Sequence, residues 1–181
     1  MQIAVDNLYL YDPQFTSGAQ SFISDTGGSS ASYPIPTFEA LETALKTHVG
    51  VKLLIFDTHG EPGSIDLPDG TKFEGMDFMI ATNTAFLKKD ARVLFYGCNL
   101  GAGKKGDTFL SETGFYLLRG KGGTVGATTS VNMTFSLGSF STEAFMVPLS
   151  FGRLKVKRYD AAGKEIGSRM VDRHGFLRSS E

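Results

Sequence analysis

The sequence has little cysteine, almost no net charge and no long apolar run. Its 181 residues include one cysteine, so no disulfide can form within the chain and the fold must depend on its hydrophobic core. The net charge of −1 does not favour electrostatic binding of nucleic acid or of an anionic membrane surface. No apolar run approaches the roughly 18 residues that a membrane span requires.

The remaining composition is that of an ordinary globular protein, with 41% hydrophobic and 20% charged residues. A chain of this length can bury a sizeable core, and we expect residues 1–181 to form a single domain. The first residues lack the basic and apolar regions of a Sec-type signal. We therefore expect a cytoplasmic protein, or one that is exported without a classical signal peptide.

The apolar pattern predicts strands that alternate with helices. We expect strands at residues 3–11, 51–57, 92–97 and 123–128, and helices at residues 37–50, 76–88 and 107–118. A hairpin is expected around the turn at residues 68–70. This order implies an α/β fold with a mostly parallel central sheet and helices on both faces.

The two ends of the chain differ in character from this core, which we place at about residues 37–150. Residues 16–36 are rich in Ser, Gly and Pro and are expected to form a loop, with a gating or self-cleavage role suggested by composition alone. After residue 130 the pattern favours antiparallel strands, with a β-hairpin over residues 151–172 as a small C-terminal addition. Residues 173–181 are predicted to be a polar tail.

Two of the predicted strands end in a reactive side chain followed by residues that bend the chain. Residues 53–60 read LLIFDTHG, and residues 93–101 read VLFYGCNLG. His59 therefore follows one strand, and Cys98, the only cysteine, follows another. Because the carboxyl ends of neighbouring parallel strands lie at the same edge of a sheet, we expect the imidazole and the thiol to lie within reach of each other.

A thiol next to an imidazole is the minimum equipment of a cysteine nucleophile. His59 would accept the proton of Cys98, because a protonated thiol is a weak nucleophile. The N–H groups of Gly60 and Cys98 would form an oxyanion hole. Taken singly, each residue has a plainer interpretation, since a lone cysteine is often a small buried hydrophobe and a histidine before glycine is often a turn residue. The joint occurrence of matched motifs is what favours a site.

Other residues near the motifs are candidates for support or for a substrate pocket. Asp57 shares the strand face of His59 and would orient the imidazole, line a pocket for a basic residue, or accept a hydrogen bond at the strand end. The other candidates are Tyr96, Asn99, Thr128, Thr129 and Ser130. His48 ends a predicted helix and His174 lies in the polar tail, so neither is expected in the site. No zinc-ligand spacing is present, and neither a metal nor a cofactor is expected.

The order of the two motifs resembles that of the caspase-fold cysteine peptidases, which include caspases, metacaspases, clostripain-like and CHAT-type proteases. The closest likeness is to a bacterial caspase-like group (DUF4347/CHAT-like), whose motifs run strand-x-x-His-Gly-x-x-Gly and strand-Tyr-Gly-Cys-x-x-Gly. Here these stand at residues 58–63 and 96–101, within a likeness that covers about residues 51–129.

The resemblance implies a caspase-like three-layer sandwich and a hydrolase, namely a cysteine endopeptidase that cleaves a protein substrate through Cys98 and His59. It also implies regulation by self-association or by an activating partner, as in an effector enzyme. The caspase sequence Gln-Ala-Cys-x-Gly is absent, and Tyr96 stands where metacaspase-like enzymes carry Asp. The small hydroxyl side chains at residues 128–130 therefore suggest a neutral or small P1 residue.

Two alternatives share these motifs. In the first, the same Cys98 and His59 serve an amidase, an acyltransferase or a deamidase effector, because the chemistry is shared and only the pocket differs. In the second, the chain is a catalytically silent caspase-like binding domain in which Cys98 is buried and unreactive.

Overall fold

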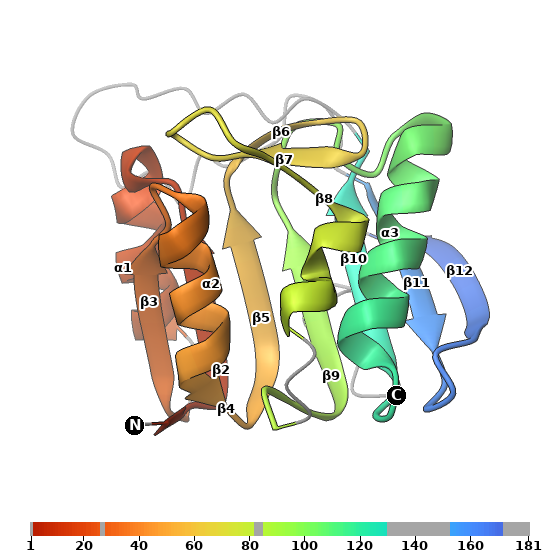
Figure 1. Cartoon of the computed structure of the whole chain (residues 1–181), viewed down its shortest axis with the longest axis horizontal. Coiled ribbons are helices and arrows are strands. Elements are labelled where there is room, and N and C mark those ends of the chain that lie inside the picture. The colour runs from red at the N-terminus through yellow and green to blue at the C-terminus, as the bar shows by residue number, and fades with distance from the viewer. Residues whose placement is uncertain (1, 26–27, 82–84, 130–152, 172–181) are drawn as a thin grey trace.

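A computed structural model gives the arrangement of the chain, and residues 2–25, 28–81, 85–129 and 153–171 are described (Figure 1). Among these residues the main element is a seven-stranded sheet with the strand order β12-β11-β10-β9-β5-β2-β3. Its strands are β2 (Asn7–Tyr11), β3 (Ser30–Pro34), β5 (Val51–Asp57), β9 (Leu87–Phe95), β10 (Gly123–Thr128), β11 (Leu154–Tyr159) and β12 (Glu165–Val171).

The sheet is parallel from β3 to β10 and antiparallel at its C-terminal side. Neighbours among β3, β2, β5, β9 and β10 pair in parallel, whereas β11 pairs antiparallel with both β10 and β12. Helices cover both faces (Figure 1). α2 (Phe38–Thr47), η2 (Gly75–Ala81) and α3 (Gly103–Leu118) lie on one face, and α1 (Thr16–Asp25) lies on the other. The predicted α/β class and the antiparallel C-terminal addition are confirmed.

Shorter elements complete the structure. β1 (Ile3–Ala4) pairs in parallel with β4 (His48–Val49), and η1 (Pro13–Phe15) follows β2. β6 (His59–Glu61), β7 (Ser64–Asp66) and β8 (Lys72–Glu74) form a small antiparallel sheet that extends from the end of β5. The hairpin expected around residues 68–70 is its β7–β8 arm.

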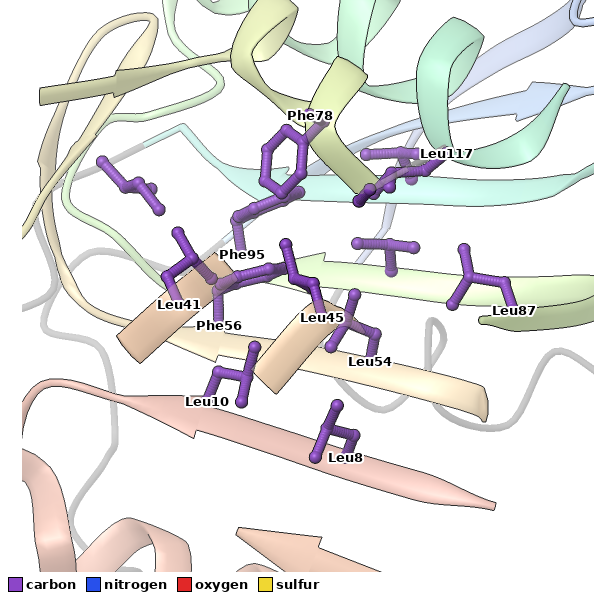
Figure 2. Packing of buried hydrophobic residues seen from close by; sticks show 14 of the residues in the cluster. Leu8, Leu10, Leu41, Leu45, Leu54, Phe56, Phe78, Leu87, Phe95 and Leu117 are labelled. Atoms are coloured by element: carbon purple, nitrogen blue, oxygen red, sulfur yellow. The ribbon is translucent and has the colours of Figure 1, made fainter. Parts of the chain in front are cut away.

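Leucine side chains and aromatic rings fill the core between the sheet and the helices α2, η2 and α3 (Figure 2). The rings of Phe56 in β5 and Phe95 in β9 are stacked, with centroids 4.7 Å apart. Phe78 of η2 meets both rings edge-on, at 5.5 and 5.7 Å, and Phe109 of α3 meets Phe95 at 5.0 Å. Burying each such ring contributes about 1.5–3 kcal/mol. This cluster therefore fixes the ends of β5 and β9 relative to α3.

A smaller cluster lies on the opposite face of the sheet. Its buried members are Tyr9, Ala19, Phe22, Leu53, Ile55, Leu94, Leu154 and Val156. Alternate residues of a strand point to opposite faces, so β5 contributes Leu53 and Ile55 here while Leu54 and Phe56 join the larger cluster. Both faces of the central strands are thus buried, as expected of a parallel sheet covered by helices.

The predicted loop over residues 16–36 is wrong. Thr16–Asp25 forms α1, and Ser30–Pro34 forms β3, which pairs with β2 at the edge of the sheet. Residues of this kind have modest helix and strand propensities, which tertiary contacts can override. Ala19 and Phe22 are the residues that α1 buries against the sheet, and that burial stabilises a helix whose composition suggested a loop.

Three predicted helices have different bounds in the structure. The helix expected at residues 76–88 is wrong in its second half, because η2 ends at Ala81 and the buried residue Leu87 begins β9. The helix expected at 107–118 begins earlier, at Gly103, and Gly114 does not interrupt it. The helix expected at 37–50 spans Phe38–Thr47, with Thr37 as its N-cap.

The strands predicted at residues 51–57 and 123–128 are confirmed, as is the hairpin within residues 151–172. The strand expected at residues 3–11 is divided into β1 and β2. Residues 130–152, where antiparallel structure was expected, and the tail at 173–181 lie outside the described residues. Within the described part of the chain, no helix is long and apolar enough to span a membrane.

Candidate active site at the carboxyl edge of the sheet

The two sequence motifs leave the sheet side by side. β5 and β9 are neighbours, with Phe56 opposite Phe95, and the N–H of Tyr96 donates to the carbonyl oxygen of Phe56 at 2.8 Å. The strands therefore end at the same level, at the edge from which β6 extends (Figure 1). We call residues 58–63 the His59 loop and residues 96–101 the Cys98 loop.

The two loops contact each other through glycine backbones. A methyl group at Gly97 would lie 3.5 Å from the Cα atom of Gly60, and one at Gly60 would lie 3.2 Å from Cδ1 of Leu100. A methyl group at Gly60 would also lie 3.0 Å from the carbonyl oxygen of Ser64, so Gly60 has little room for a side chain. His59 precedes Gly60 and Cys98 follows Gly97, so each lies one residue from this contact.

Both reactive side chains reach the surface. His59 is exposed, and its ring packs against that of Phe15 in η1, with centroids 5.0 Å apart. Cys98 is half-buried. Phe15 lies between the predicted strand at residues 3–11 and the predicted loop at residues 16–36, and no pattern in the sequence linked it to His59.

A sharp turn follows Cys98. Asn99 has φ of 54°, in the left-handed region that asparagine tolerates better than most residues. The N–H of Ala102 donates to the carbonyl oxygen of Asn99 at 2.8 Å, and that of Gly101 donates to the carbonyl oxygen of Thr128 at 2.7 Å. Strained conformations of this kind persist where the surroundings fix them, which is common at functional sites.

The first turn of α3 packs against the Cys98 loop. A methyl group at Gly106 would lie 2.2 Å from the carbonyl carbon of Gly101, so only glycine allows this approach. Helix α3 is itself held to β9 by the ring contact between Phe109 and Phe95. The position of the Cys98 loop is thus set by the larger hydrophobic cluster.

A tight turn shapes the His59 loop. Pro62 and Gly63 connect Glu61 of β6 to Ser64 of β7, and Gly63 has φ of 95°. Proline followed by glycine at these two positions is the preferred sequence of a type II turn. The N–H of Gly63 also donates to the carbonyl oxygen of Leu100 at 3.1 Å, which ties this turn to the Cys98 loop.

The register of this hairpin orients one candidate oxyanion donor. Glu61 and Ser64 are the pair nearest the two-residue turn, and Gly60 and Ile65 are the next pair. Hydrogen-bonded and non-hydrogen-bonded pairs alternate along antiparallel strands. The pair that closes the turn is hydrogen-bonded, so the N–H of Gly60 points away from β7.

Thr128, the last residue of β10, and Thr129, which follows it, lie next to the Cys98 loop. The buried hydroxyl of Thr128 donates to the carbonyl oxygen of Gly97, and that of Thr129 donates to the carbonyl oxygen of Arg153 at 2.9 Å. Thr128 therefore anchors the Cys98 loop, although the two segments are far apart in the chain. Ser130 lies outside the described residues.

Asp57 and Tyr96 face the smaller core cluster. The buried carboxylate of Asp57 accepts a hydrogen bond from the hydroxyl of Tyr9 at 2.7 Å, and its carbonyl oxygen accepts one from the N–H of Asp12 at 2.8 Å. Both contacts are those of an acceptor at the strand end, which is one of the three roles that the sequence left open. The ring of Tyr96 is half-buried and packs against the same cluster.

Charged groups near the loops lie on the surface. The carboxylate of Glu61 accepts a hydrogen bond from Lys72 at 2.5 Å, which lowers the pKa of Glu61 and raises that of Lys72. Because both side chains are exposed, the pair contributes little to stability. No group of three or more His, Cys, Asp or Glu side chains suited to a metal ion occurs in the part of the chain that the structure describes.

The structure thus defines an α/β domain in which a cysteine loop and a histidine loop meet at the carboxyl edge of a parallel sheet. Residues 34–121 match the model of a family described as "Domain of unknown function (DUF4347)", and this stretch contains both loops and all of α3. The likeness to DUF4347 expected from the motifs is confirmed over that stretch. No curated protein and no solved structure matches the chain.

Proposed function

We propose that this protein is a caspase-like cysteine endopeptidase in which Cys98 is the nucleophile and His59 the general base. The contact between Gly60 and Gly97 carries the proposal, because it places the two reactive residues on touching loops. The accessible positions of both side chains agree with it. The mostly parallel sheet, the helices on both faces and the hairpin after the histidine support the caspase-like assignment.

In this mechanism the sulfur of Cys98 attacks the carbonyl carbon of the scissile peptide bond while His59 takes the thiol proton. The tetrahedral intermediate collapses when the C–N bond breaks, and His59 gives its proton to the leaving amine. Water then attacks the thioester, again with His59 as base. The C–S bond breaks, the acid product leaves and the thiol is restored.

The N–H of Gly60 would stabilise the oxyanion together with that of Cys98. The hairpin register directs the Gly60 N–H away from β7, so the ladder to that strand does not occupy it. Donors fixed in place before the reaction cost little reorganisation, and loss of one such donor typically slows catalysis by a factor of about 10²–10³.

The substrate is proposed to be a protein with a neutral or small P1 residue. Thr128 and Thr129 lie beside the Cys98 loop, and the hydroxyls of both donate to backbone carbonyl groups. Neither supplies a charge that would select an acidic or a basic P1 side chain. Self-association or an activating partner, as in other caspase-fold enzymes and effectors, belongs to the same proposal.

Alkylation of the single cysteine by iodoacetamide tests the pair directly. At pH 7 we expect the folded wild type to be modified at Cys98, and His59→Ala to react about tenfold more slowly because the proton acceptor is lost. His174→Ala is the matched control and should react as the wild type does. Equal rates for wild type and His59→Ala, or reaction only after unfolding, would contradict the pair and favour a binding domain.

The reaction class needs a second measurement. Wild type and Cys98→Ser are incubated with an unfolded protein mixture, and new N-termini are identified by mass spectrometry while ammonia is assayed. Cleavage that depends on Cys98 supports a peptidase and gives the P1 preference. Ammonia release without new termini would replace the peptidase by a deamidase.

A further inference from the structure

A hollow of about 700 Å³ lies at the opposite edge of the sheet, where β5, β9 and β10 begin. We call it the basic cleft. Its lining includes six cationic side chains and one carboxylate, that of Asp90. The cationic residues are Lys52, Lys88, Lys89, Arg92, Arg158 and Arg169. In a chain whose net charge is −1, this is a strong local excess of positive charge.

The sheet register places three arginines on one face. Arg92 of β9 lies opposite Thr124 of β10, and Thr124 lies opposite Arg158 of β11. Val156, two residues from Arg158 on the same strand, lies opposite Arg169 of β12. Because residues opposite each other point to the same face, the three guanidinium groups share the face on which Val156 is buried. Strands about 4.8 Å apart separate the backbones of Arg92 and Arg158 by roughly 10 Å.

The cationic side chains of the cleft are only partly neutralised. Lys52 and Lys88 both bind the carboxylate of Asp6, at 3.0 and 3.4 Å. Among the residues that the structure describes, Lys89, Arg158 and Arg169 form no ion pair. Like charges held close together on one sheet face repel each other, so an anion in the cleft would offset a cost that the free protein carries.

Burial adds to this cost at Arg92. Partial desolvation lowers the pKa of its guanidinium, which nonetheless stays charged at neutral pH. A half-buried cation such as Arg92 gains more from a nearby anion than an exposed one does, because water screens the interaction less.

We propose that the basic cleft binds a small anion that carries two or more phosphate groups. Guanidinium groups match phosphate oxygens in pairs, and three of them on one face suit a ligand with several such groups. The volume of the cleft is that of a small-molecule site. The hydroxyl of Thr124 and the backbones of Gly123 and Gly167 also line it and can come close to a ligand.

Titration with sodium tripolyphosphate tests the proposal, with amide NMR spectra and calorimetry as readouts. We expect shifts at Gly123, Thr124 and Gly167 and saturable binding. Arg158→Gln and Arg169→Gln should each weaken binding about tenfold, since each removes a charge-assisted hydrogen-bond pair. Arg119→Gln is the matched control, because Arg119 lies at the end of α3 over the ring of Phe115 and should bind within twofold of wild type.

Several results would overturn the proposal. Equal weakening by Arg119→Gln would show a diffuse charge effect, and shifts confined to other residues would place the anion elsewhere. If tripolyphosphate binds no more tightly than sulfate does, the cleft has no preference for a ligand with several phosphate groups. Tighter binding of a single-stranded oligonucleotide, per phosphate, would indicate a nucleic-acid surface instead. Mapping on the wild type decides the location even if an arginine variant is unstable.

The cleft is independent of the peptidase proposal. Cys98 lies at the carboxyl edge of the sheet and does not line the cleft. Cys98→Ser should therefore bind tripolyphosphate as the wild type does, whether or not the chain cleaves protein. A lost response in this variant would contradict a separate site.

Discussion

The two edges of the sheet show two different ways to build a site. At the carboxyl edge the backbones of Gly60 and Gly97 touch, and hydrogen bonds and the turn at Asn99 set where the reactive side chains lie. At the amino edge the shared feature is charge, contributed by side chains of the four strands β5, β9, β11 and β12. The first kind of site depends on tight packing, whereas the second depends on a sum of charges that salt screens.

This difference predicts that a substitution at one edge leaves the other unchanged. The largest expected effect is that of Cys98→Ala, which removes the proposed nucleophile and should lower peptide cleavage by a factor of about 10⁴. Tripolyphosphate binding and the urea midpoint should stay at wild-type values, because the change removes one sulfur atom from a half-buried position. Cleavage assays and urea unfolding of the same samples check both halves, and residual cleavage near the wild-type rate would exclude Cys98 as nucleophile.

The packing of the carboxyl edge can be broken without touching a reactive residue. Gly106→Ala places a methyl group 2.2 Å from the backbone of Gly101, which must move. Although alanine favours a helix, overpacking typically costs about 1–3 kcal/mol, and we expect about 2 kcal/mol less stability and slower Cys98 alkylation.

Gly167→Ala is the matched control for that substitution. A methyl group at Gly167 would meet no atom within 4 Å, so urea unfolding should give a free energy within about 0.5 kcal/mol of wild type. Equal losses of stability for Gly106→Ala and Gly167→Ala would show that the close contact between α3 and the Cys98 loop is not what destabilises Gly106→Ala.

The antiparallel addition next to the basic cleft should lose stability at alkaline pH. Burial, aided by the charge of Glu165, raises the pKa of Tyr159, whose hydroxyl donates to the carbonyl oxygen of Leu110 at 2.9 Å. Unfolded tyrosine releases its proton near pH 10, while the folded protein retains it. The stabilising contribution is therefore complete below about pH 10 and falls as pH rises toward the higher folded value, by at most about 1.4 kcal/mol per pH unit.

Tyr159→Phe isolates this group. It should be about 1 kcal/mol less stable than wild type at pH 8, because one hydrogen bond is lost. The difference should shrink between pH 10 and 11.5 in urea unfolding experiments. A constant difference over that range would show that Tyr159 does not cause the alkaline loss.

The smallest expected effect concerns the charges of the cleft in the free protein. Arg158→Gln removes one of several like charges on one sheet face and should raise the free energy of unfolding by about 0.3–0.5 kcal/mol in low salt. The gain should vanish in 1 M NaCl, where screening is nearly complete. Arg119→Gln should show no such salt-dependent gain. A loss of stability in Arg158→Gln would mean that this guanidinium stabilises the fold.

Much of the fold could be predicted from local patterns. The strands at residues 51–57 and 123–128 were predicted with their observed bounds, because short apolar runs bounded by turn residues are a strong signal. The helix α1 and the strand β3 were missed because their stability comes from the partners that they pack against. The start of β9 was predicted to be helix, because a short apolar run beginning at Phe86 fits both the periodicity of a helix and that of a strand.

The sequence by itself determined the α/β class and the two motifs, and from their order it predicted that cysteine and histidine would meet at one sheet edge. Those features are local, since they depend on periodicity and on which residue follows a strand. Tertiary structure decided that Phe15 packs on His59, that Thr128 anchors the Cys98 loop and that six cations line one cleft. These residues are distant in the chain, and strand order and register bring them together. Strand order and register in turn depend on which apolar side chains are buried against each other across the whole domain.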